Sequence, residues 1–111
     1  MNMREYEQRA MALRLPTADS LYALFNLVGE VGEFFSKIAK ERRDGAVDDT
    51  DPAQLKAFMA GLHKELGDIL WQLTAVAADC GTSLEDIAKL NLEKLEGRKA
   101  SGTLQGSGDN R

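Results

Sequence analysis

Two long stretches of the chain repeat apolar residues every three or four positions, the spacing of one face of an α-helix. The first runs from about residue 20 to Arg43, with apolar positions Leu21, Leu24, Phe25, Val28, Val31, Phe35 and Ile38. The second runs from about Pro52 to Asp79, with apolar positions Leu55, Phe58, Met59, Leu62, Leu66, Ile69, Leu70, Leu73 and Val76. No stretch alternates like a strand, so the pattern predicts an all-α protein.

Turn and capping residues place two shorter helices on either side of this pair. A narrow apolar stripe precedes Pro16 and predicts a short first helix, and it consists of Met3, Tyr6, Ala10 and Leu13. Thr17, Asp19 or Ser20 would cap the second helix, and Asp51 followed by Pro52 would begin the third. Gly81 then stops the third helix, and Thr82 or Ser83 begins a fourth that ends near Arg98.

Two long and two shorter helices predict a four-helix-bundle-like protomer that gains from oligomerisation. We expect one domain over residues 1–100, followed by a Gly/Ser-rich tail over residues 101–111. Such a tail has little to bury and alone should be mobile. It could instead order over a bound triphosphate, with its glycine amides and Arg111 contacting phosphate.

Composition excludes several classes of protein. The net charge of -4 argues against binding to nucleic acid. Cys80 is the one cysteine, so no disulfide can form within the chain, which fits a reducing cytoplasm. No apolar run approaches the roughly 20 residues of a membrane span, and the N-terminal residues lack the apolar core of a signal peptide. We therefore expect a cytoplasmic protein without a membrane partner.

The two long helices carry similar acidic turns, EVGE at residues 30–33 and ELGD at residues 65–68. Positions three apart lie only about 60° apart around a helix, so each turn presents two carboxylates on one face. Small residues lie around these acids, among them Gly29, Gly32 and Gly67. A mid-helix glycine costs about 1 kcal/mol relative to alanine, which favours close approach of a helix or ligand over a plain solvated surface. The solvated surface remains an alternative, because such turns are common on helices.

Four carboxylates that meet cannot all stay ionised without a positive partner. If the two helices are antiparallel and the turns meet, oxygen-only ligands favour Mg²⁺, or Mn²⁺ as a substitute. A di-iron site would need Glu-x-x-His pairs, and the one histidine, His63, has Ala60 three positions before it. We therefore set di-iron chemistry aside.

In these acidic turns the chain resembles the all-α nucleoside triphosphate pyrophosphatases, above all their small, single-domain MazG-like members. The resemblance runs from about Leu21 to the end of the chain. It rests on "GEVGEFFSKIAKE", on "KELGDILWQLTAVAADCGTSLEDIAKLNLEKLEGRK" with its N-x-x-K-L-x-x-R pattern, and on "GSGDNR".

The resemblance implies Mg²⁺-dependent hydrolysis of a (deoxy)nucleoside triphosphate to the monophosphate and pyrophosphate. It also implies a homodimer or homotetramer. Carried over by position, the metal ligands and catalytic residues would be Glu30, Glu33, Glu65 and Asp68. The candidate substrate-binding residues would be Asn91, Lys94, Arg98, Lys37 and Trp71.

Several of these assignments have alternatives. Asn91 falls in the fourth helix's apolar stripe, so it could be a hydrogen-bonded structural residue. Lys37 could pair with Glu33 one turn away, and Trp71 could belong to the core or an interface. Many relatives carry an extra glutamate where this chain has Gly29. If that residue is their general base, the proton must pass here to a ligand carboxylate or to hydroxide on the metal.

Two other functions stay open at this stage. The chain could be a non-catalytic, oligomeric helical interaction module whose acids keep it soluble. It could also be a narrow dUTP or dCTP hydrolase within the same superfamily, because base choice depends on pocket shape.

Overall fold

The computed structural model describes residues 1–109 and contains four α-helices and no strand over that range. They are α1 (Met3–Ala12), α2 (Ser20–Asp44), α3 (Pro52–Asp79) and α4 (Leu84–Ser101). The all-α prediction is confirmed, and each helix lies within a few residues of its predicted bounds.

Side-chain caps begin three of the helices, as the sequence predicts. The Asp19 carboxylate accepts the Tyr22 N–H at 2.9 Å and caps α2. Asp51 caps α3 ahead of Pro52, and the Ser83 hydroxyl caps α4. Each cap satisfies a backbone N–H that has no partner inside its helix, so the three starts are determined locally.

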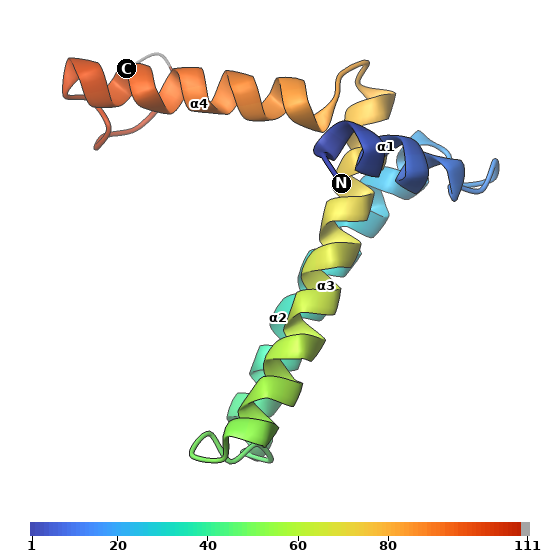
Figure 1. Ribbon diagram of the computed structural model, residues 1–111, viewed down its shortest axis with the longest axis vertical. Coiled ribbons are helices and arrows are strands. Elements are labelled where there is room, and N and C mark those ends of the chain that lie inside the picture. The colour runs from blue at the N-terminus through green and yellow to red at the C-terminus, as the bar shows by residue number, and fades with distance from the viewer. Residues whose placement is uncertain (110–111) are drawn as a thin grey trace.

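The helices do not form a four-helix bundle within one chain. Figure 1 shows α2 and α3 side by side as a long pair, α1 across one end of it, and α4 pointing away from it. The radius of gyration is 17.7 Å, whereas a compact domain of this length has about 13 Å. The predicted bundle-like protomer is thus wrong at the level of the single chain, because α4 has its main contacts with α1.

The apolar stripe predicted as the core face of α2 lies largely in solvent. Phe25 and Val28 are each 72% exposed, and Phe35 is 62% exposed. Parts of the α3 stripe are exposed as well, including Leu66 and Met59. The opposite side of α2, which carries the acidic turn, faces α3. Periodicity locates an apolar face but does not say whether the same chain covers it.

Small residues form most of the core between α1, α2 and α3. The buried apolar side chains are Ala10, Ala23, Leu62, Ala75, Ala77 and Leu84. Polar contacts hold the end of the helix pair together: Arg14, after α1, donates two 2.8 Å hydrogen bonds to Asp79 at the end of α3. The small side chains allow the helices to approach closely.

The segment after α4 folds back along that helix (Figure 1). Gly102 takes the left-handed φ of 72° that ends α4, and Asp109 then reaches Lys94 and Arg98. The expected phosphate contact through Arg111 lies outside the described residues.

None of the four helices combines the length and the apolar content needed to cross a membrane.

Candidate functional site

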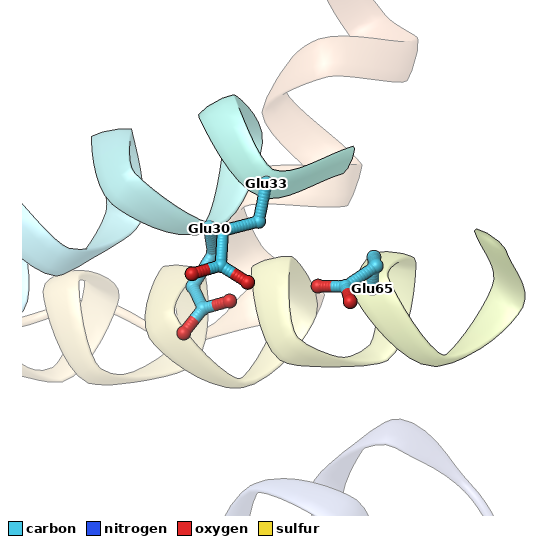
Figure 2. A group of neighbouring side chains, drawn as sticks. All are labelled: Glu30, Glu33 and Glu65. Carbon is cyan, nitrogen blue, oxygen red and sulfur yellow. The ribbon is translucent and has the colours of Figure 1, made fainter. Parts of the chain in front are cut away.

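Three of the four predicted acids meet between the two long helices. Carboxylate oxygens of Glu30, Glu33 and Glu65 all lie within 4.8 Å of one another. Figure 2 shows Glu30 and Glu33 reaching from α2 and Glu65 reaching toward them from α3. We call these three residues the acidic group. The antiparallel arrangement that the metal hypothesis assumed thus brings these three residues together, and their role as metal ligands stays a prediction.

Burial differs across the acidic group. Glu65 is only 8% exposed, Glu30 is half-buried and Glu33 is exposed. Solvent therefore reaches the group from the α2 side, while its floor on α3 is closed. A cation or a phosphate could approach only from the open side.

Burial raises the pKa of Glu30, and the neighbouring charges of Asp68, Glu33 and Glu65 raise it further. The Asn26 side chain, one turn earlier on α2, opposes this shift. The part of the raised pKa of Glu30 that comes from these like charges means that they are not fully balanced by positive charge. This imbalance is the electrostatic property that a bound cation would remove.

Lys37 supplies part of that positive charge. Its Nζ lies 2.9 Å from Glu65 Oε1 on the neighbouring helix, and it does not form the predicted i,i+4 pair with Glu33. The contact crosses beside Gly61, where an added Cβ would stand 3.8 Å from Lys37 Nζ. Lys37 thus crosses from α2 to α3 at the edge of the acidic group, at ordinary contact distance from the position of that Cβ.

Asp68, the fourth predicted acid, is exposed and does not belong to the acidic group. It is near enough that its charge raises the pKa of both Glu30 and Tyr6. Burial makes the largest contribution to the raised pKa of Tyr6, and the Thr74 side chain lowers it. Tyr6 thus lies beside Thr74, where α1 packs against the helix that carries Glu65 and Asp68.

The predicted substrate-binding residues of the fourth helix are not brought to the acidic group within one chain. Asn91 is exposed, although α4 contacts α1 and Leu84 at the start of α4 is buried, so the expected burial of its amide does not occur. Lys94 Nζ and Arg98 Nη2 both lie 3.2 Å from the same Asp109 oxygen. Arg98 also donates to the Gly108 carbonyl at 2.9 Å and is only 7% exposed.

Trp71 makes a structural contact between α3 and α1. Its indole Nε1 donates to the carbonyl of Ala10 at 3.1 Å, which joins α3 to α1. The side chain is half-buried and lines a pocket beside the α1–α2 connection. This hydrogen bond therefore fixes the indole ring in place, while part of the ring stays accessible to solvent.

Comparison with known proteins identifies the family to which the chain belongs. The model of the MazG nucleotide pyrophosphohydrolase domain matches residues 19–102. The chain belongs to the MazG family. It is also 38% identical over 90 residues to the "Gene 37 protein" of Mycobacterium phage L5, a match that covers 81% of this chain and 75% of that protein. No solved structure matches the chain.

The MazG match spans both acidic turns and all of α2, α3 and α4. MazG domains in general depend on a divalent metal, and the acidic group fits such an ion chemically. Its ligand atoms are all carboxylate oxygens, which suit hard cations, and burial together with the neighbouring carboxylates raises the pKa of Glu30. The family thus assigns a pyrophosphohydrolase class, and the site offers a place for its metal.

Sequence reasoning missed the surroundings of three residues. Tyr6 lies beside Thr74 of α3, Gln72 is buried on α3, and Asp109 pairs with Lys94 and Arg98 on α4, away from the acidic group. Gln72 follows Asp68 by one turn on α3. The sequence therefore showed the position of Gln72, but it did not show that the side chain is buried. Nothing in the sequence showed that Asp109 would pair with two of the predicted phosphate-binding cations.

Proposed function

We propose that the protein is a Mg²⁺-dependent nucleoside triphosphate pyrophosphohydrolase. The reaction would join water to the α-phosphorus of a (deoxy)nucleoside triphosphate and break the bond to the bridging oxygen, so that the monophosphate and pyrophosphate leave. The observation that carries this proposal is the convergence of Glu30, Glu33 and Glu65 from two helices of a MazG domain. The biological use would be sanitation or control of the nucleotide pool.

Glu30, Glu33 and Glu65 would hold the cation, and Asp68 would complete the set by a change of rotamer in its exposed side chain. The chemistry that Mg²⁺ supplies when bound is charge neutralisation on the triphosphate and activation of the attacking water. Glycine at position 29 leaves no further carboxylate there. The proton released from water would therefore pass to an oxygen of one of the four acids.

Positive side chains would bind the triphosphate itself. Lys37 stands at the open edge of the acidic group, and a bound cation would release it from Glu65. Lys94, Arg98 and Asn91 would contact phosphate or sugar. In one chain α4 points away from the acidic group (Figure 1), so we place these contacts on the acidic group of a second copy.

A homodimer, or a tetramer of dimers, would cover the exposed apolar face of α2. The chain exposes 8260 Å², whereas a compact monomer of this mass exposes about 6,100 Å². That excess is well above the roughly 800 Å² that each partner contributes to a standard interface. Exposed Phe25, Val28 and Phe35 supply the apolar centre that such an interface needs.

The direct test is release of pyrophosphate from a panel of ribo- and deoxynucleoside triphosphates, with Mg²⁺ and with a chelator. We expect turnover that requires the metal and falls at least 100-fold in Glu33→Gln. The matched control is Glu96→Gln, which removes the same charge from exposed α4 and should stay active. A panel without any turnover would leave the interaction-module alternative in place, and a fully active Glu33→Gln variant would show that turnover does not depend on the acidic group.

A further inference from the structure

A concave site lies between the α1–α2 connection, the start of α2 and α3. It has a volume of about 280 Å³. Its walls are mostly apolar or aromatic, and they include Leu13, Leu15, Thr17, Tyr22, Trp71 and Gln72. We call it the Gln72 pocket. Apolar walls with one fixed polar group are typical of small-molecule sites.

Gln72 is the buried polar residue of this pocket, and its side-chain oxygen has no hydrogen-bond partner in the described part of the chain. The residue is only 5% exposed, and this Oε1 atom is itself buried. A buried acceptor without a donor destabilises the fold, so native proteins rarely keep one. Leucine or methionine would fill the same space without that cost, which indicates that the amide serves a ligand.

The position of the pocket is set by the two helices that carry the acids. Gln72 follows Glu65, the α3 member of the acidic group, by seven residues, about 10 Å along the helix axis. Tyr22 precedes Glu30 by eight residues on α2, about 12 Å in the same direction because the helices are antiparallel. The pocket is therefore displaced from the acidic group by about 10 to 12 Å along the helix pair.

A nucleotide has matching chemistry along its length: phosphates at one end, a sugar, and then a planar base with hydrogen-bond donors on its edge. We propose that the Gln72 pocket binds the base and that the Gln72 amide selects among bases. The unpartnered Oε1 would accept from a base N–H, while Tyr22 and Trp71 provide aromatic walls. The hydrogen bond from Trp71 to Ala10 holds one wall in place before the ligand binds.

This inference rests on the proposed hydrolase function and deepens it, and one data set separates the two. kcat/KM is measured for triphosphates that differ only in the base, with the wild type, Gln72→Met and Gln72→Glu. Gln72→Met should lower kcat/KM for the preferred base by roughly 10- to 100-fold and change the poorest substrate by less than 3-fold. Gln72→Glu should change the order of preference, because one donor position becomes an acceptor.

Gln8→Met is the matched control, since Gln8 is exposed on α1 and its change should leave base preference intact. Thermal melting adds a readout apart from activity. Gln72→Met should keep or raise Tm in the absence of ligand, because it removes an unsatisfied buried oxygen. A lower Tm together with equal loss for every base would show a structural glutamine and overturn the inference. If the wild type turns over no base at all, it is the hydrolase proposal that fails.

Discussion

The repulsion inside the acidic group makes Glu30→Gln an informative perturbation. Two unit charges 4.8 Å apart, the largest separation in the group, repel by about 0.9 kcal/mol in bulk water and about 3.5 kcal/mol at an effective dielectric constant of 20. Because Glu33 is exposed and Lys37 offsets Glu65, the lower value applies. Removing the Glu30 charge relieves its repulsion with Glu33 and Glu65, roughly 2 kcal/mol in total.

The assay is thermal unfolding at one fixed protein concentration, in a chelator and again with Mg²⁺. In the chelator, Glu30→Gln should melt roughly 8 °C above the wild type. With Mg²⁺ the wild type should gain Tm, because a ligand that binds only the native state stabilises it by about 2.7 kcal/mol at 100 times its Kd. The variant, which lacks one proposed ligand, should gain less than half as much. Glu96→Gln should match the wild type in both conditions.

The pH dependence of this difference follows from the raised pKa of Glu30. A folded-state pKa above the unfolded one means that the fold binds the proton more tightly. The carboxyl group therefore carries no penalty below its ordinary pKa, and the penalty develops as pH rises through the raised value. The Tm advantage of Glu30→Gln should vanish in acid and be complete at neutral pH.

A Glu30→Gln variant that melts below the wild type in the chelator would refute this reasoning. So would a variant that keeps the full gain in Tm with Mg²⁺. The first result would mean that Lys37 and solvent already balance the acidic group, and the second would mean that the cation binds elsewhere.

Three further predictions concern assembly and the tail. Phe25→Glu should shift the protein toward monomer in sedimentation experiments and abolish turnover, whereas exposed Gln8→Glu should do neither. Glu33→Gln and Asn91→Ala should each be inactive alone. Mixed after unfolding and refolding together, they should recover about a quarter of wild-type activity, because one composite site in half of the dimers is intact. If every site were built from one chain, mixing would recover nothing. Asp109→Asn should lower KM for the triphosphate several-fold, since Asp109 pairs with Lys94 and Arg98; an unchanged KM would remove the tail from substrate binding.

The helix ends were predictable because the signals that set them are local. Asp19, Asp51 and Ser83 each cap the helix that follows within three residues, and Gly102 ends α4 in a left-handed conformation. The acidic group was predictable for a related reason. Two residues one turn apart on a helix must share a face, so the spacing alone placed Glu30 beside Glu33.

The sequence did not predict what covers the apolar faces of the helices. The α2 stripe has the periodicity of a core face, yet in one chain it stays exposed, while the side of α2 with the acidic turn faces α3. The amphipathic pattern is the same whether the cover is another helix of the chain or a second copy. The same ambiguity explains Asn91, which has a buried position by pattern and an exposed one in the protomer.

The sequence by itself determined where the helices begin and end, and which carboxylates share a helical face. These properties depend on residues within about one turn of each other, so they need no knowledge of the rest of the chain. Only the tertiary structure decided that Lys37 pairs with Glu65, that Gln72 is buried without a partner, and that Asp109 returns to Arg98. Each of these depends on which segments meet in space, and that follows from packing over the whole fold.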